Sequence, residues 1–404
     1  MKYVLVIGDG MADTALQELG GKTPLEFLSL PHFDILAGCE HGTVRTVPLG
    51  VPAGSDTAIL NIFGYDPRLY YTGRSVLEAA GVGVLLQAGE VSLRLNLCAV
   101  ENGVMLSHNG GGVEGAEAET LMRDLIGDPA FAQAAARLSL GVTVSRTFRH
   151  IGVIHAPEAG EFLLKEPHNI LGEKWEGYLP QGALAEELAA LMQASYAFLD
   201  VHPINAARRA AGKLPANLLW PWGAGRAARL ASFRNKYGHG GAVISAVPLV
   251  WGIASLAGLP TPKVKGATGE LDTNYEGKVA AALSALTAGD DFTAIHVEAP
   301  DEMAHAGDLE RKLEAIRRLD ARVIAPLLEQ LPKVDPEFRL LLLSDHPTLL
   351  TTRTHDGAPV PYAIYDSRRP GKPRKFSETE ARKGPALANG DLLMPRLFEQ
   401  DKEM

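Results

Sequence analysis

The stretch KYVLVIGDGMAD, residues 2–13, decides the fold. It begins as an almost continuous apolar run, which is typical of a parallel strand that is buried on both faces. Gly-Asp-Gly ends the run, so we expect Asp9 to lie where the strand gives way to a loop. Ligands of α/β sheets bind beyond the carboxyl ends of the strands, and Asp9 is therefore a candidate site residue.

Two later segments repeat this pattern of a strand that ends at acidic and imidazole side chains. They are DFTAIHVEAPDEMAH, residues 291–305, and RLLLLSDHPT, residues 339–348. Between them, residues 310–331 have the periodicity of a helix whose apolar face carries Leu313, Ile316, Leu319 and Val323. The order strand, acid, helix, strand, acid predicts an α/β fold with a doubly wound sheet.

A smaller second domain is expected within this sheet domain. Between about Gly89 and Lys236 the chain alternates short strands with alanine-rich helices, and glycine-rich stretches such as SHNGGGVEG interrupt them. We therefore predict a discontinuous core of residues 1–88 and 237–404, and an inserted smaller α/β domain of residues 89–236. The charged segment after Asp366 is expected to be a surface loop.

Composition excludes several classes of partner. The 404 residues carry a formal net charge of −9 and no basic run, which argues against nucleic-acid binding. No apolar run has transmembrane length, and we expect no membrane partner. Cys39 and Cys98 are too few for a disulfide framework and suit a reducing cytoplasm, where we expect the protein to work. No feature of the sequence indicates an oligomeric state.

Three aspartates and three histidines follow the predicted strands and form a candidate metal site. Each alone has an ordinary structural explanation, such as a turn for Asp9 or a helix cap for Asp301. Together, unpaired acids at three strand ends would repel one another in a partly buried cleft unless cations lie between them. The mixed nitrogen and oxygen set suits Mn²⁺ or Zn²⁺. Its members are Asp9, Asp301, His305, Asp345, His346 and His355.

Ser55 in AGSDTAIL, residues 53–60, has two possible roles. A serine ahead of helix-forming residues is often the N-cap. The same position faces unpaired N–H groups that favour phosphate, and it therefore also suits a nucleophile. Two neighbouring cations would deprotonate the hydroxyl and orient a phosphoryl group. The predicted metal site thus favours the nucleophile.

Several blocks resemble cofactor-independent phosphoglycerate mutases of the archaeal type, which belong to the alkaline phosphatase superfamily. The metal and nucleophile blocks are GDGMAD, GSDTAILNIFGYDP, HVEAPDEMAHAGD, SDH and THDGAPVP. The blocks GGKTPLE, TGRSVLEAAGVG, HPINAARRAAGKLPAN and GATGELDTNYEGK extend the resemblance over nearly the whole chain. The resemblance implies a phosphatase-like core, an inserted transferase or lid domain and a phosphoserine intermediate on Ser55. It also implies two divalent ions, most commonly manganese, with zinc, cobalt or magnesium as alternatives.

The resemblance also implies how the ligands divide between the two ions. One ion would be held by Asp9, Ser55, Asp345 and His346, and the other by Asp301, His305 and His355. The implied activity is that of a glycolytic isomerase that interconverts 3-phosphoglycerate and 2-phosphoglycerate. The partner would thus be a small phosphorylated substrate.

One block departs from the family pattern and leaves alternatives open. The chain reads LLWPWGAGR at residues 218–226, where the mutases tend to read LLRGAG. A related subgroup with tryptophan here has been proposed to phosphorylate homoserine, so the alternatives are a homoserine kinase-like phosphotransferase or a metal-dependent phosphatase. A metal-binding regulator without turnover is a further hypothesis. The tryptophans are about as well explained by ordinary packing.

Four residues of the inserted domain are candidates for substrate binding. His108 lies in the glycine-rich loop LSHNGGG and would hold phosphate, or is simply a solvated loop residue. Arg208 is a candidate phosphate or carboxylate ligand, or part of a solvated helix face, and Asn205 is expected to fix its loop. Arg226 follows the two tryptophans and is the remaining candidate.

Overall fold

The computed structural model describes residues 1–399 and divides the chain into two compact units. Unit 1 contains residues 1–71 and the chain from residue 229 onward, and unit 2 contains residues 72–228. Both borders lie earlier in the chain than the predicted borders of residues 89–236. The reason is that α5 (Arg74–Gly81) packs against β3 (Glu90–Glu101) and β9 (Leu218–Arg226), which are strands of unit 2.

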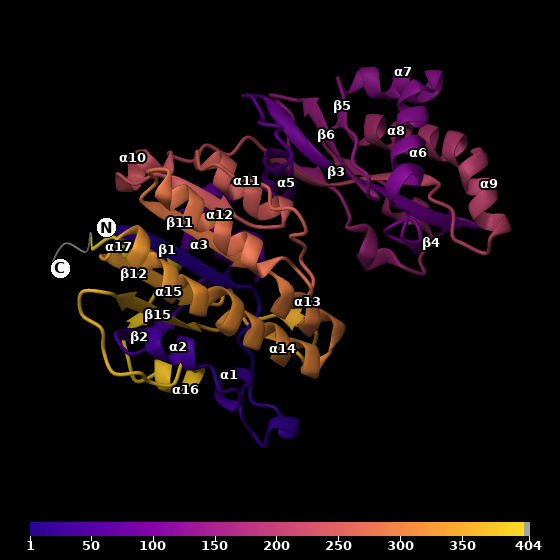
Figure 1. Cartoon of the computed structure of the whole chain (residues 1–404). Helices are drawn as coiled ribbons and strands as arrows, with labels where there is room; N and C mark the ends of the chain where they lie inside the picture. The colour runs from indigo at the N-terminus through magenta and orange to yellow at the C-terminus, as the bar shows by residue number, and fades with distance from the viewer. Residues whose placement is uncertain (400–404) are drawn as a thin grey trace. The chain divides into compact units, whose positions relative to one another are not determined.

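Unit 1 is built on a seven-stranded sheet with the strand order β10-β11-β1-β12-β15-β2-β16 (Figure 1). Only β15 runs against the other strands, because it pairs antiparallel with both β12 and β2. The central β1 pairs in parallel with β11 on one side and with β12 on the other. The strands are β1 (Lys2–Gly8), β2 (Glu40–Val44), β10 (Gly241–Ile244), β11 (Phe292–Val297), β12 (Phe338–Leu343), β15 (Val360–Asp366) and β16 (Ala386–Leu387).

Helices cover both faces of this sheet, as the doubly wound prediction requires. On one face Val4 and Val6 pack in a core with α2, α12, α14 and α15, and on the other Phe292 meets Phe63 at the end of α3. The longer helices are α2 (Pro31–Leu36), α3 (Ser55–Ile62), α11 (Pro248–Leu256), α12 (Tyr275–Thr287), α13 (Ala299–Ala306), α14 (Leu309–Leu319) and α15 (Ala325–Val334). Shorter ones are α1 (Pro24–Phe27), α4 (Pro67–Tyr70), α10 (Phe233–Tyr237), α16 (Glu378–Ala381) and α17 (Leu393–Leu397).

The helix predicted over residues 310–331 is confirmed with one irregularity. A π-helical turn, Asp320–Ile324, separates α14 from α15. Asp320 in this turn accepts hydrogen bonds from the backbone N–H groups of His32 and Phe33, at the start of α2. The four residues of the predicted apolar face are all buried.

Unit 2 is an antiparallel sheet around the long strand β3, which pairs with β4, β6 and β9. Alternate residues of β3 pack with three helices into one hydrophobic core, among them Leu93, Leu95 and Leu97. The remaining strands are β4 (Val104–Ser107), β5 (Gly141–Thr143) and β6 (Arg149–His155), with a separate pair β7 (Phe162–Leu163) and β8 (Gln181–Gly182). The helices are α6 (Gly115–Gly127), α7 (Pro129–Arg137), α8 (Ala185–Leu199) and α9 (Pro203–Ala210).

The prediction of a surface loop after Asp366 is wrong for its second half. Phe376 is fully buried against Phe33, with ring centroids 5.5 Å apart. The chain then forms α16 and returns to the sheet as β16. This segment is rich in charged residues, so its composition predicts a loop. Its aromatic side chain Phe376 packs into the core and holds the segment there. In the part of the chain that the structure describes, no helix combines the length and apolar character needed to cross a membrane.

Candidate functional site

Three neighbouring strands of unit 1 bring the predicted ligands together. The order β11-β1-β12 places the carboxyl ends of these strands side by side. Asp9 follows β1, Asp301 lies in the first turn of α13 after β11, and Asp345 follows β12. Residues that are hundreds of positions apart in the sequence thus meet at one edge of the sheet. His355 arrives on β14 (Thr354–His355), which pairs with β13 (Thr348–Leu349).

The first ligand group consists of Asp9, Asp345, His346 and Ser55. The Nε2 atom of His346 lies 3.1 Å from Asp345 Oδ2, 3.6 Å from Asp9 Oδ1 and 3.1 Å from the Ser55 hydroxyl. The other Asp345 oxygen accepts hydrogen bonds from the backbone N–H groups of Gly10 and His346, at 3.0 and 2.9 Å. Asp345 is therefore held by the backbone while its Oδ2 faces the group.

The second ligand group consists of Asp301, His305 and His355. His305 Nε2 lies 3.2 Å from Asp301 Oδ2 and 2.8 Å from His355 Nε2, and His355 Nε2 lies 3.5 Å from Asp301 Oδ1. The i, i+4 spacing on α13 thus places Asp301 and His305 together as predicted. His346 also has a ring nitrogen within 4.8 Å of ligand atoms of Asp301 and His355. His346 therefore lies close enough to both ligand groups to belong to either.

The chemistry of these side chains fits divalent cations. Asp9 Oδ1 and Asp345 Oδ2 are buried, and neither accepts a hydrogen bond from residues 1–399. Burial, together with the nearby carboxylates of Asp345 and Asp301, raises the pKa of Asp9 well above its usual value. Hydrogen bonds from His305 and His355 outweigh burial and hold the pKa of Asp301 far below its usual value. Carboxylates and imidazole nitrogens that converge in this way form a ligand set for a divalent cation.

Ser55 is not a helix cap. It is the first residue of α3, and the N-cap position belongs to Gly54, whose backbone is extended. No side chain caps this helix. The Ser55 hydroxyl instead points to His346 Nε2, so the structure removes the capping interpretation.

Comparison with known proteins identifies the family. A family model described as 2,3-bisphosphoglycerate-independent phosphoglycerate mutase matches residues 37–205. The Methanosarcina acetivorans protein of that name is 43% identical over 387 residues, which cover 95% of this chain and 96% of the relative. The chain belongs to the 2,3-bisphosphoglycerate-independent phosphoglycerate mutase family. A Geobacter sulfurreducens protein named as a probable mutase of this kind is 44% identical over 99% of this chain and 100% of its own length.

Solved structures share the fold of this chain. A Pyrococcus horikoshii protein is 30% identical and superposes with a TM-score of 0.80, covering 100% of this chain and 98% of its own. The cofactor-independent phosphoglycerate mutase from Thermoplasma acidophilum superposes with a TM-score of 0.66 at 23% identity, over the full length of both chains. The second comparison shows a shared fold, and it confirms the α/β architecture expected for a member of the mutase family.

Within this mutase-family chain, three of the residues predicted for the substrate site make hydrogen bonds inside unit 2, as expected for Asn205. The amide of Asn205 is fully buried and bonds to Leu199 and Ala216. The Arg208 guanidinium pairs with Glu117 and donates to the carbonyl oxygens of Leu214 and two glycines. Arg226 donates to the carbonyl oxygens of Ala156 and Ala159. Because the polar groups of these three residues already form hydrogen bonds within unit 2, we do not include the residues in the proposed substrate site.

Arg94 and Arg149 form a cationic group on the sheet of unit 2 that was missed in the sequence. The predicted His108 lies near it, and burial lowers the pKa of this histidine. Arg94 pairs with Glu78 at 2.5 Å and stacks over Trp222 at 4.2 Å, and Arg149 lies 3.5 Å from the same glutamate. Burial lowers the pKa of Arg149 to about 10, so it stays charged at neutral pH. His168 lies between His108 and Trp222, with ring centroids 6.0 and 5.6 Å away. The signal was the alternation of polar residues in VSLRLNLCAV, which places Arg94 and Asn96 on one face of β3.

Unsatisfied polar atoms accompany this cationic group. The Trp222 Nε1, Asn96 Oδ1 and Arg149 Nε atoms are buried and have no hydrogen-bond partner among residues 1–399. Trp220 differs, because its indole donates to the Lys165 carbonyl within a hydrophobic core. Residues 218–226 differ from the mutase pattern by two tryptophans, and ordinary packing explains the first of them, Trp220. Trp222 also belongs to that core, but it presents an unused donor beside charged residues.

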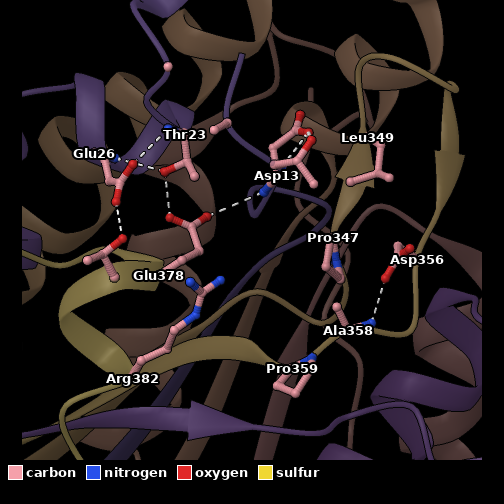
Figure 2. A pocket seen from close by; sticks show the side chains of 14 residues that line it. Asp13, Thr23, Glu26, Pro347, Leu349, Asp356, Ala358, Pro359, Glu378 and Arg382 are labelled. Atoms are coloured by element: carbon pink, nitrogen blue, oxygen red, sulfur yellow. Dashed lines mark hydrogen bonds between the residues drawn. The ribbon is translucent and has the colours of Figure 1, made fainter.

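A cavity of about 490 Å³ is lined by residues close in sequence to the ligands, such as Asp13, Pro347 and Asp356, yet none of the seven predicted ligands lines it. Figure 2 shows that many of the polar residues that line the cavity form hydrogen bonds with one another. The Thr23 hydroxyl donates to Glu378, and the Ala358 N–H donates to Asp356. Asp13 lines the cavity, and its carboxylate forms an ion pair with Lys312 at 2.8 Å.

Proposed function

We propose that this member of the mutase family interconverts 3-phosphoglycerate and 2-phosphoglycerate through a phosphoserine on Ser55. The observation that carries the proposal is the place of the Ser55 hydroxyl, 3.1 Å from His346 Nε2, where the two ligand groups adjoin. A hydroxyl there lies at the N-terminus of α3, where unpaired backbone N–H groups favour a phosphoryl group. Relatives of nearly full length carry the name of this activity.

Two divalent cations, with manganese as our first choice, would be held by the two ligand groups. Asp9, Asp345, His346 and Ser55 would hold one, and Asp301, His305 and His355 the other. When bound, such ions lower the pKa of a hydroxyl and stabilise the charge of a phosphoryl group in transfer. Thr348 supports this arrangement, because its hydroxyl donates to Asp301 Oδ1 at 2.5 Å.

The chain's own residues would then carry the phosphoryl group between two positions of glycerate. Ser55 attacks the substrate phosphorus, and the bond to the glycerate oxygen breaks. The glycerate turns while it stays bound, and its other hydroxyl takes the phosphoryl group from Ser55. Water must be kept out during this interval, because it would hydrolyse the phosphoserine. We propose that unit 2 acts as the transferase or lid domain that prevents this.

We propose that the cationic group of unit 2 binds an anionic group of the kind that phosphoglycerate carries. Arg149, Arg94 and His108 would bind carboxylate or phosphate oxygens, because guanidinium groups pair with these anions in a forked geometry. Glu78 neutralises only part of the charge of Arg94 and Arg149. The unused Arg149 Nε donor supports this assignment.

One experiment separates this activity from its alternatives. Purified protein is incubated with Mn²⁺ and 3-phosphoglycerate, and the products are followed by phosphorus NMR. A mutase forms 2-phosphoglycerate with little free phosphate, whereas a phosphatase releases phosphate and glycerate. A homoserine kinase-like enzyme ignores phosphoglycerate but converts ATP and homoserine to ADP and phosphohomoserine. Formation of either alternative set of products alone would overturn the proposal.

Removal of divalent metal is expected to abolish this activity, since three buried carboxylates and three imidazoles make up the two ligand groups and His346 of these groups contacts Ser55. Treatment with excess chelator followed by desalting should leave less than 1 part in about 100 of the rate, and Mn²⁺ should restore it. Isothermal titration should report two bound ions per chain. Replacing His305 by alanine should weaken one of them, while His155→Ala on β6 should change neither. Full turnover in excess chelator would contradict the proposed metal site.

Replacing Arg149 by methionine is expected to raise KM for phosphoglycerate about 10- to 100-fold, because a charged hydrogen bond contributes about 1.5–3 kcal/mol. Steady-state kinetics with saturating Mn²⁺ measure the effect. Arg146→Met is the matched control, since Arg146 is exposed and its ion-pair contact is with Glu119 at 3.5 Å. If both variants keep the wild-type KM, Arg149 does not bind the substrate.

We further propose that the protein works in the cytoplasm, as expected from its composition. Cys39 and Cys98 are both free thiols, and Cys98 is buried. A reducing compartment maintains free thiols. Fractionation of cells that express a tagged copy would test this location.

A further inference from the structure

A hydrogen-bonded chain of buried side chains ends on the metal ligand Asp9. The backbone N–H of Val247 donates to the Ser245 hydroxyl at 3.0 Å, and Ser245 Oγ lies 3.1 Å from His296 Nδ1. The other ring nitrogen, His296 Nε2, lies 2.9 Å from Asp9 Oδ2. Ser245, His296 and Asp9 are each at most 1% exposed. The chain links β10, β11 and the end of β1, three adjacent strands of the sheet.

The contacts determine which nitrogen of His296 carries the proton. Ser245 Oγ already accepts from the Val247 N–H, so its own proton is available for His296 Nδ1. A cation bound at the first ligand group would keep Asp9 as a carboxylate, which offers only acceptors, so the hydrogen then lies on His296 Nε2. The imidazole is then neutral, with Nδ1 accepting and Nε2–H donating. Each group in this chain therefore donates a hydrogen bond to the next, from the Val247 N–H through Ser245 and His296 to Asp9.

These contacts give the two carboxylate oxygens of Asp9 different surroundings. Oδ2 accepts from His296, whereas Oδ1 is buried without a hydrogen bond from the described residues and faces His346 at 3.6 Å. A carboxylate on a loop after a strand is otherwise free to rotate about its Cβ–Cγ bond. The imidazole fixes that rotation and leaves Oδ1 aimed at the first ligand group.

We propose that His296, held by Ser245, is a positioning residue that orients Asp9 for the metal ion of the first ligand group. This inference rests on the proposed metal site. The partners of ligand groups commonly change metal affinity 10- to 100-fold when they are removed. His296 itself binds neither metal nor substrate in this arrangement. Its effect therefore appears first in the affinity for metal and only through it in turnover.

The test compares two substitutions, each of which retains a polar group near only one of the two ring nitrogens of His296. His296→Gln places an amide near the position of Nε2 and keeps a donor for Asp9, while His296→Asn reaches only the position of Nδ1. Isothermal titration of metal-free protein with Mn²⁺ should show about 10- to 100-fold weaker binding at one site for His296→Asn. His296→Gln should stay within about threefold of wild type. KM for phosphoglycerate at saturating Mn²⁺ should change in neither variant.

His41→Asn is the matched control, because His41 is also buried in unit 1 but packs on Phe376, with ring centroids 5.2 Å apart, and contacts no ligand. It should lower stability without changing Mn²⁺ affinity. If His296→Asn does not fold, Ser245→Ala provides the test, since it releases Nδ1 and should weaken Mn²⁺ binding several-fold. Wild-type affinity in every folded variant overturns the inference. Failure of wild type itself to bind Mn²⁺ would instead overturn the proposed metal site.

Discussion

Replacing Ser55 by alanine is expected to reduce the interconversion of phosphoglycerates by about 10⁴-fold or more, the range seen when a catalytic nucleophile is removed. The structure places no other hydroxyl of the described residues in hydrogen-bond contact with His346 Nε2. Mn²⁺ binding should be weakened little, because six ligand side chains remain. Rapid quenching of wild type with labelled phosphoglycerate, followed by peptide mapping, should find the label on the peptide that contains Ser55.

Ser284→Ala is the control for this prediction. Ser284 is an exposed residue of α12 that makes no contact with the ligand groups, so its variant should keep the wild-type rate. Substantial turnover by Ser55→Ala would mean that phosphate is transferred without this serine. The label would then be found on another peptide or on none.

Replacing Lys312 by methionine is expected to lower the free energy of unfolding by about 3–5 kcal/mol, because it leaves the carboxylate of Asp13 buried without its cation. Lys312 Nζ lies 2.8 Å from Asp13 Oδ2 and 2.7 Å from the Thr348 carbonyl, and the two side chains of the ion pair are 0% exposed. The ammonium group thus ties the loop after β1 to β13. Urea denaturation of metal-free protein, followed by fluorescence, measures the loss.

Two further variants test the cause of that loss. Lys333→Met removes an exposed lysine whose ion pair with Glu329 lies on the surface, and it should cost less than about 1 kcal/mol. Asp13→Asn combined with Lys312→Met removes both buried charges and should be more stable than Lys312→Met alone. A loss below about 1 kcal/mol for Lys312→Met would show that the buried pair contributes little to unit 1.

The residues proposed as metal ligands could be selected from the sequence because local patterns place them in standard positions of an α/β sheet. Apolar runs mark the buried strands, and Asp9 and Asp345 follow such runs closely, while Asp301 lies in the first turn of the helix after the next run. The i, i+4 spacing of Asp301 and His305 needs only one turn of α13 to bring them together. Family resemblance supplied the rest of the grouping, and the distances agree with it, except that His346 adjoins both groups.

The residues that we propose for substrate binding could not be selected in the same way. Arg208 looks available in the sequence, but its guanidinium donates to carbonyl oxygens of unit 2. Asn205 fixes the chain there, as expected, through hydrogen bonds to Leu199 and Ala216. Arg94, Arg149 and Trp222 come together only because β3 pairs with both β6 and β9. Strand pairing across long stretches of chain depends on the register of the whole sheet, which no local pattern specifies.

The sequence by itself determined the α/β class, the residues at the strand ends and the presence of a second unit. These follow from hydrophobic periodicity and from the position of polar residues along the chain. Only the tertiary structure decided that Ser55 caps no helix and that His296 contacts Asp9. The sequence shows His296 as one polar residue in an apolar strand, and its meaning depends on which strands lie beside it. Side-chain hydrogen bonds act over about 3 Å, so they are decided by the packing of distant segments.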